Sequence, residues 1–483
     1  MTLRAAAVGG ITWSALDRIS RVLLSFLVFT ALARLLRPAD FGLVALASIY
    51  ISLLEVFVTQ GLGTVLIQRV EVTSSHLDTA FWVSFVAALF VAVLTVVLAP
   101  LGARLFSTPD LTLVLRALAL LVPFSALGIV PVAILSREMA FDRLAIRSVA
   151  SAVLGGASGV AAAWAGWGVW ALVIQSVVFG VSGTVAVWLS TPWRPGRRVS
   201  RTALADLWRL GAALTANDLL WFFSRKGDET VVAYGLGTLA LGSYSVANRL
   251  LTILVDVLTS PIQTVALPMM SRLQQDKRQL AKGIVEGSIW SAAVGWPTFV
   301  GLFVIAPTLV PLLFGPKWIA ATPILQVLCV AGLVRVASVM HHPALLAINR
   351  PWTYFALFAL HAVLTVAASA IAALTGRAEW VAVSQAVAYT VTGIANFTVL
   401  FRATEFSVAR LVAGWATVAV PCALMAGIVI VLTSTLQSHQ FPLPVVLVGS
   451  VVAGVFSYAL MMLVTMRSML TTALAVVKAR AKR

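Results

Sequence analysis

The sequence predicts an all-α integral membrane protein of about fourteen transmembrane helices. Of its 483 residues, 60% are hydrophobic and 11% are charged, whereas about 25% of the residues of soluble proteins are charged. Hydrophobic runs recur along the whole chain at the length of about 20 residues that crosses a bilayer as a helix. Runs such as 87–98 are almost continuously apolar, which argues against the alternating pattern of a barrel strand. A soluble enzyme and a disordered basic protein are therefore excluded.

Each predicted span is an apolar run bounded by polar residues or turns. The first six spans are 11–36, 41–67, 79–106, 111–136, 146–165 and 168–190. The next six are 208–234, 238–271, 283–306, 319–342, 352–374 and 379–401. The last two are 409–434 and 444–466. The first run is too long for the apolar core of a signal peptide, so we interpret it as a span.

The distribution of cations predicts the orientation. With both termini on one side, that side receives 22 of the 34 Lys and Arg residues, the other side receives five, and seven lie within spans. Because Lys and Arg are enriched in cytoplasmic loops, we expect both termini in the cytoplasm, which requires an even number of spans. The basic stretch 191–210 is interpreted as a cytoplasmic loop that also contacts anionic lipid headgroups. It has no aromatic–basic pattern that would indicate nucleic-acid binding.

A weak internal repeat has an offset of 200 residues. Residues 41–47 align with 241–247, and the pair Thr64-Val65 aligns with Thr264-Val265. Six spans separate the copies, and because six is even the repeat is parallel, with an expected axis along the membrane normal. We predict a first lobe, 1–200, with spans one to six, and a second lobe, 201–404, with spans seven to twelve. The remaining part, 405–483, contains the last two spans and a basic cytoplasmic tail. A central cavity is expected between the two lobes.

Ionisable residues within spans identify the candidate site. Each costs about 2.5–3.5 kcal/mol on insertion scales, so such residues usually face a bundle interior or an aqueous cavity. They concentrate in spans one, two, seven and eight, which the repeat makes equivalent. Guanidinium suits phosphate because its planar fork donates two parallel hydrogen bonds and stays charged. The candidate ligands of an anionic substrate are Arg18, Arg21, Arg225, Arg249 and Arg335.

The acidic residues of these spans have two open interpretations. A cavity carboxylate can load and release a coupling cation, or it can neutralise a neighbouring arginine. The residues concerned are Asp17, Glu55, Asp228 and Asp256. Spacing of four residues also allows internal salt bridges between Asp17 and Arg21 and between Arg225 and Glu229. Such bridges are an alternative to substrate binding for these arginines.

Catalytic and metal chemistry is not indicated. The two cysteines, Cys329 and Cys422, lie in apolar stretches, and the five histidines show no metal-ligand spacing. The sequence has no GxxxxGKS/T phosphate-binding loop. The loops predicted outside are too short for the polar catalytic domain of a glycosyltransferase or polymerase. We therefore expect no catalytic residue, no metal and no cofactor.

Four segments carry a resemblance to a known family: LARLLRPADFG at 32–42, GLGTVLIQR at 61–69, ILSREMAF at 134–141 and GSYSVANR at 242–249. With them the chain resembles, over essentially its whole length, the Wzx-like (PST) polysaccharide flippases of the multidrug/oligosaccharidyl-lipid/polysaccharide (MOP) exporter superfamily. The resemblance implies a MATE-like fold and alternating access without ATP hydrolysis. The implied substrate is an undecaprenyl-diphosphate-linked oligosaccharide, moved from the cytoplasmic to the periplasmic leaflet of the bacterial inner membrane for exopolysaccharide, capsule or O-antigen (lipopolysaccharide) assembly.

The resemblance also implies roles and partners. Cationic side chains in the central cavity of related flippases engage the diphosphate, and Arg18 and Arg21 match that role by their position in span one. Membrane lipids and the polymerase and glycosyltransferases of the same pathway are the implied partners. Two alternatives stay open. A cation-coupled multidrug exporter of the same superfamily would rely on carboxylates more than on arginines, and a membrane-bound polysaccharide polymerase or ligase would act on the exported units.

Overall fold

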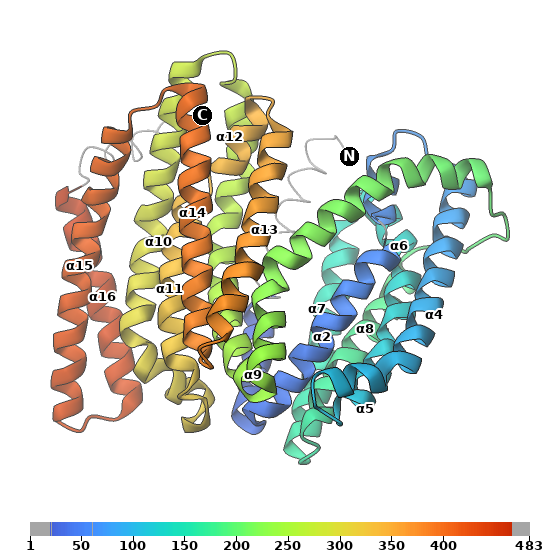
Figure 1. Ribbon diagram of the computed structural model, residues 1–483, viewed down its shortest axis with the longest axis horizontal. Coiled ribbons are helices and arrows are strands. Elements are labelled where there is room, and N and C mark those ends of the chain that lie inside the picture. The colour runs from blue at the N-terminus through green and yellow to red at the C-terminus, as the bar shows by residue number, and fades with distance from the viewer. Residues whose placement is uncertain (1–19, 21, 60, 466–483) are drawn as a thin grey trace. The chain divides into compact units, whose positions relative to one another are not determined.

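The computed structural model describes residues 20, 22–59 and 61–465. Its described residues form helices and connecting loops without β-strands, which confirms the predicted all-α membrane class. Twelve helices in the described part are long and apolar enough to cross a membrane. The chain forms two compact units, residues 1–245 and 246–483 (Figure 1).

The first unit starts with an apolar helix over Val22–Leu35, the described part of the predicted first span. The following helices are α2 (Pro38–Thr59), α3 (Leu62–Gln68), α4 (Ser74–Leu105), α5 (Leu111–Ala119), α6 (Leu121–Arg137), α7 (Phe141–Trp164) and α8 (Val169–Ser190). Spans two and four therefore each consist of two helices in succession. Apolar side chains from α3, α4 and α6 pack around Leu66 and Val130. Outward faces stay apolar and exposed, as lipid requires.

Helix α9 (Arg201–Arg272) contains both predicted spans seven and eight. It consists of two helices that meet at Gly237, whose φ of 81° and ψ of 178° are not helical. Glycine adopts a positive φ at little cost because it has no Cβ. The break lies between 234 and 238, where the sequence predicts the end of one span and the start of the next. The boundary between the two compact units, at 245/246, falls within the second of these helices.

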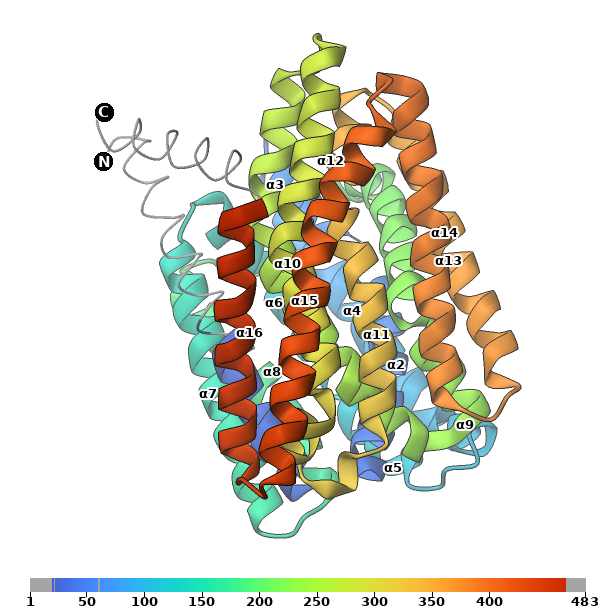
Figure 2. The same ribbon diagram turned by 90° about the vertical axis from the view of Figure 1, so that its left-hand side faces the viewer.

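The second unit continues from α9 through a long helix to two helical pairs and a final hairpin. Its elements are α10 (Lys277–Phe314), the short 3₁₀ helix η1 (Pro316–Trp318), α11 (Ala321–Ala337), α12 (His341–Ala347), α13 (Pro351–Ala373), α14 (Ala378–Thr404), α15 (Val408–Ser438) and α16 (Leu443–Thr465). Helices α13 and α14 pack against each other, and the α15–α16 pair packs on α10 (Figure 2). Predicted span ten consists of α11 and α12. The exact number of fourteen spans stays a prediction, as do the lobe boundaries near 200 and 404.

Two glycines bring the start of α2 against the start of the second helix of α9. A methyl group added at Gly42 would overlap the carbonyl oxygen of Thr238, and one added at Gly242 would overlap the carbonyl oxygen of Pro38. The contact is symmetric, because Thr238, which Gly42 meets, lies 200 positions after Pro38, which Gly242 meets. This symmetry agrees with the offset of the predicted repeat. Only glycine allows backbones to approach this closely.

The basic stretch 191–210 is held to the first unit at the start of α4. Buried Asp78 accepts a hydrogen bond at 2.9 Å from the backbone N–H of Gly196. The indole of Trp82 donates to the carbonyl of the same glycine at 2.7 Å. The backbone between α8 and α9 is therefore fixed by specific contacts, although its predicted contact with anionic lipid stays a prediction.

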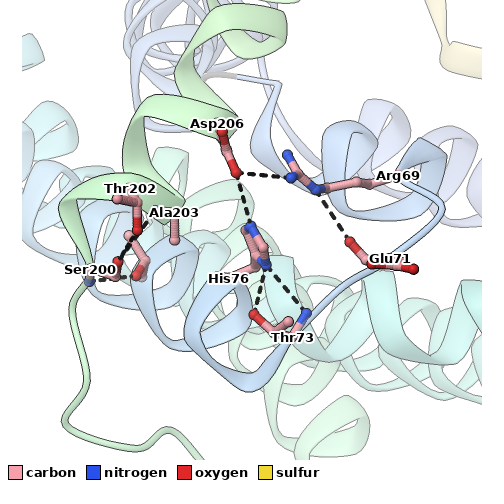
Figure 3. Close-up of polar contacts among 9 residues, drawn as sticks. Arg69, Glu71, Thr73, His76, Ser200, Thr202, Ala203 and Asp206 are labelled. Atoms are coloured by element: carbon pink, nitrogen blue, oxygen red, sulfur yellow. Dashed lines mark hydrogen bonds and ion pairs between the residues drawn. The ribbon is translucent and has the colours of Figure 1, made fainter.

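A second set of contacts joins the first turns of α9 to the loop before α4 (Figure 3). The carboxylate of Asp206 pairs with the Arg69 guanidinium at 2.9 Å and lies 3.6 Å from Nε2 of His76. His76 in turn accepts a hydrogen bond through Nδ1 from the backbone N–H of Thr73, at 3.2 Å. These contacts connect the basic stretch 191–210, which we call the linker, to the residue after α3 and to the first turn of α4.

Candidate functional site

Three of the predicted site residues lie outside the described residues. They are Asp17, Arg18 and Arg21, all in the predicted first span. The proposed roles of the two arginines and the alternative Asp17–Arg21 salt bridge therefore stay predictions. The remaining six predicted residues are placed by the structure.

Arg225 packs against an aromatic ring in the first unit. Its guanidinium lies over the ring of Trp221, one turn earlier on α9, with 4.6 Å between the guanidinium carbon and the ring centroid. The alternative Arg225–Glu229 salt bridge is wrong, because Glu229 pairs instead with Lys226 at 2.6 Å. The Arg225 side chain turns back towards Trp221, away from the following turn. Within the described residues Arg225 forms no ion pair, so its charge is left for another partner.

Asp228 is a buried acceptor in the first unit. The hydroxyl of Tyr244, in the second helix of α9, donates to Oδ2 of Asp228 at 2.5 Å, and both side chains are at most 1% exposed. A distance of about 2.5–2.7 Å is typical of a hydroxyl that donates to a charged carboxylate. The bond crosses the break at Gly237, so it joins the two helices of α9. Tyr244 belongs to the segment GSYSVANR, yet its partner could not be read from the sequence.

Glu55 lies half-buried on α2, beside the Ser125 hydroxyl of α6. No arginine is paired with it among the described residues. The interpretation as a charge-balancing residue therefore gains no support, and the interpretation as a coupling residue stays a prediction.

Arg249 and Asp256 both belong to the part of α9 in the second unit. Arg249 has an exposed side chain and Asp256 is half-buried. They are seven residues apart, which is about 10 Å along the axis and about two turns, so they share a side of the helix without direct contact. Their assignment to substrate and to coupling stays a prediction.

Arg335 of α11 meets an aromatic ring and a histidine in the second unit. Its guanidinium carbon lies 5.1 Å from the centroid of the Tyr389 ring on α14. The His361 ring on α13 packs on the same tyrosine, with 4.3 Å between centroids. Sequence reasoning missed both partners. In the sequence this place is marked by His361, a histidine in the middle of an apolar span. Two hydroxyl residues, Thr365 and Ser369, follow it at steps of four.

Two of the three described candidate arginines share one arrangement, each in its own unit. Arg225 and Arg335 are both held on aromatic rings, and neither forms an ion pair within the described residues. A guanidinium on a ring keeps its N–H donors available while its position is fixed. Such groups in spanning helices suit an anionic ligand with several oxygen acceptors, such as a phosphate. The described residues contain no group of three or more His, Cys, Asp or Glu side chains placed to hold a metal ion.

Known proteins match the chain in sequence and fold. The family model described as "Polysaccharide biosynthesis protein" matches residues 31–323, more than half of the chain. The succinoglycan biosynthesis transport protein ExoT of Rhizobium meliloti (strain 1021) is 26% identical over 98% of this chain and 95% of its own length. The lipopolysaccharide biosynthesis protein WzxC of Escherichia coli (strain K12) is 27% identical over 69% of this chain and 68% of its own.

Solved structures show the same fold at low sequence identity. The lipid II flippase MurJ, in an inward closed conformation, matches with a TM-score of 0.77 at 12% identity, over 96% of this chain and 100% of that one. An inward-facing MATE multidrug transporter of the MOP superfamily matches with a TM-score of 0.62 at 15% identity, over 81% and 99%. With the family match over more than half of its length, the chain belongs to the polysaccharide biosynthesis protein family, and it has the fold of the MurJ and MATE structures.

Proposed function

We propose that the protein is a flippase for lipid-linked oligosaccharides. It moves undecaprenyl-diphosphate-linked repeat units from the cytoplasmic to the periplasmic leaflet of the bacterial inner membrane, for the assembly of exopolysaccharide, capsule or O-antigen. The observation that carries the proposal is the match to a succinoglycan transport protein over 98% of this chain and 95% of that protein. Alternating access without ATP hydrolysis is the proposed mechanism, with both termini in the cytoplasm.

The arginines in the spanning helices support an anionic headgroup as the cargo. A diphosphate with attached sugars cannot cross hydrocarbon unaided, and arginine donates to phosphate oxygens through two parallel N–H groups. Arg225 and Arg335, held on Trp221 and Tyr389, are the described candidates with no ion pair of their own. Arg18, Arg21 and Arg249 complete the proposed set.

Complementation of a deletion strain tests the proposal. The strain should accumulate lipid-linked repeat units on the cytoplasmic side, and the wild-type gene should clear them. Arg225→Ala and Arg335→Ala should each lower export by about tenfold or more, since a hydrogen bond to a charged group is worth about 1.5–3 kcal/mol. Arg116→Ala is the matched control, because Arg116 also lies in a predicted span but donates to the backbone carbonyl of Val96.

The outcomes separate the remaining alternatives. If the lipid-linked units of the deletion strain reach the outer leaflet and stay unpolymerised, the flippase proposal fails and a polymerase is favoured. A multidrug exporter is the second candidate, because a MATE transporter shares the fold. That candidate requires a drug-sensitive deletion strain with normal surface polysaccharide, and it would depend on Glu55 or Asp256 more than on the arginines.

A further inference from the structure

A row of polar side chains runs along the second helix of α9, in the second unit. Its ends are fourteen residues apart, so it extends over about 21 Å of helix, about two thirds of the hydrocarbon core of a bilayer. At about 100° per residue, its members lie within about 80° of the helix circumference. We name this set the polar stripe. It consists of Arg249, Thr252, Asp256, Ser260 and Gln263.

Most of the polar stripe has hydrogen-bonding groups that the protein itself does not use. Four members form no side-chain hydrogen bond and no ion pair with the described part of the chain: Thr252, Asp256, Ser260 and Gln263. The first three are half-buried and the fourth is exposed. Two other hydroxyls of the same helix differ, because Thr259 and Thr264 each donate to the backbone carbonyl four residues earlier, at 2.8 and 2.9 Å.

A lipid environment does not suit the polar stripe. A polar group that faces hydrocarbon without a partner is strongly disfavoured. A hydroxyl can turn back to a carbonyl of its own helix, but the carboxylate of Asp256 only accepts, and the N–H groups along the helix are already used. On the opposite side of the helix, about 180° from Asp256, Val265 is 63% exposed. The side with Val265 thus suits lipid, and the side with the polar stripe suits water.

The fold itself does not require charged residues at these places. In the repeat with an offset of 200 residues, α2 is the equivalent of the second helix of α9, and the symmetric glycine contact agrees with this offset. Arg249 corresponds to Ile49 of α2. Asp256 corresponds to Val56. Because apolar residues occupy the equivalent places in α2, the two charges serve a purpose that α2 does not share.

The chemistry of the polar stripe suits the hydroxyl groups of an uncharged sugar. Sugar hydroxyls donate and accept, and the stripe offers partners of both kinds: two hydroxyls, an amide, a carboxylate and a guanidinium. The charge of Asp256 would repel an anion along the stripe. A hard cation takes several ligands around one point, whereas the members lie on successive turns, about 4.5–6 Å apart along the axis. A row of this kind fits an extended ligand with a hydroxyl at each step.

We propose that the polar stripe binds the sugar part of the cargo. The inference rests on the proposed function and adds to it: arginines engage the diphosphate, and the polar stripe engages the uncharged sugars attached to it. Water on the stripe is replaced by sugar hydroxyls with the same capacity to donate and accept. Gln263 lies nearest the end of the helix that is predicted to be cytoplasmic, where the cargo enters. A longer sugar chain contacts more turns of the stripe.

Cysteine labelling tests whether the polar stripe faces water, without any transport. Thr252→Cys and Ser260→Cys are reacted in liposomes with a charged thiosulfonate reagent on both sides of the membrane. Val265→Cys is the matched control, an exposed position on the opposite side of the same helix. The native cysteines are at most 3% exposed, so their background is low. The stripe variants should react at least about tenfold faster than the control, because the reactive thiolate needs water. Equal rates overturn the proposal.

Transport of two probes in proteoliposomes tests the binding of sugar. Both are fluorescent prenyl diphosphates, one with a single neutral sugar and one with four, and rates are measured below saturation. Thr252→Val and Ser260→Ala each remove one hydroxyl. Each should lower the flipping rate of the four-sugar probe by about 2- to 10-fold, which is the loss of one hydrogen bond between neutral groups, and should affect the one-sugar probe less.

Two matched variants control for the substitution itself. Thr252→Ser keeps the hydroxyl and should keep the wild-type rates for both probes. Thr259→Val removes a hydroxyl from the same helix, but this hydroxyl is buried and bonded to the backbone, so the rates should stay unchanged. If Thr259→Val slows the four-sugar probe as much as Thr252→Val does, the effect is not specific to the polar stripe and the proposal is wrong.

The two proposals fail differently. If the wild type flips both probes and the stripe variants slow both equally or neither, the sugar inference is overturned and the flippase function stands. If Asp256→Asn alone abolishes the flipping of both probes, the carboxylate serves a coupling cation instead, which also overturns it. A wild type that flips neither probe contradicts the proposed function. The labelling of Ser260→Cys then still decides on sugar binding, because the four-sugar probe should slow it more than the one-sugar probe.

Discussion

Replacing Tyr244 by Phe should test the buried bond that joins the two helices of α9. The substitution removes the hydroxyl that donates to Asp228 at 2.5 Å and keeps the ring, so it opens no large cavity. Because Asp228 and Tyr244 are at most 1% exposed, water does not replace the lost donor. The carboxylate of Asp228 is left with one donor fewer in a buried place.

The expected cost follows from the type of bond. A hydrogen bond to a charged group contributes about 1.5–3 kcal/mol, which is about 10- to 150-fold in the unfolding equilibrium constant. Tyr234→Phe is the matched control, since Tyr234 is in the first helix of α9, which also carries Asp228, is 69% exposed and contacts the ring of Phe106. This control should change the free energy of unfolding by no more than about 0.5 kcal/mol.

A double-mutant cycle with Asp228→Asn measures the bond itself. The free energy of unfolding is obtained by titrating the purified protein in mixed micelles with dodecyl sulfate, followed by circular dichroism. The two substitutions should couple by at least about 1 kcal/mol, because they remove the two ends of one interaction. A coupling energy below about 0.5 kcal/mol refutes the assignment of this bond as a stabilising contact.

Three further substitutions test the close helix contact, the linker and a helix cap. Gly42→Val should destabilise the protein by about 1–3 kcal/mol through overpacking, whereas Gly427→Val, with no atom within 4 Å of an added Cβ, should be nearly neutral in the same unfolding titration. Asp78→Ala should lower the free energy of unfolding by about 1–3 kcal/mol and speed tryptic cleavage within 191–200. The control is Asp110→Ala, which replaces an exposed aspartate. If the two variants are cleaved at the same rate, the attachment of the linker through Asp78 is contradicted. Hydrogen bonds from the backbone and side chain of Gln279 hold the pKa of Asp276 below its ordinary value of 3.8. A lowered pKa stabilises the fold above the unfolded-state value, and this contribution is lost as the pH falls through the folded-state value. Asp276→Ala should therefore be less stable than the wild type at neutral pH, and the difference should shrink towards about pH 3; a constant difference contradicts the cap.

The sequence predicts most helices well because hydropathy alone determines where a chain can cross lipid. The predicted spans 168–190 and 352–374 match α8 (Val169–Ser190) and α13 (Pro351–Ala373) to within a residue. The internal breaks of spans two, four and ten were not predicted. A break of one or two residues leaves the mean hydropathy of a 20-residue window almost unchanged, so it has no signal on that scale.

The charged positions could be predicted, but their partners could not. Arg225 and Arg335 stand out because cations are rare in apolar runs. Their aromatic partners do not, because an aromatic residue is common in any span and Tyr389 is far from Arg335 in sequence. The salt bridge considered as an alternative for Glu229 involved Arg225, whereas the structure pairs Glu229 with Lys226. Spacings of three and four residues both bring side chains together on a helix, and rotamers decide between them.

The contact between Gly42 and Gly242 also sets an order for biosynthesis. Its two sides are 200 residues apart, and at about 5–20 residues per second the ribosome needs about 10–40 seconds to cover that distance. During this interval the small-residue surface of α2 has no partner from its own chain. It is then available to any other helix with small residues in the same membrane, including α2 of a second nascent copy. Chains that stop before residue 242 should keep that surface exposed, which makes them targets for membrane quality-control proteases.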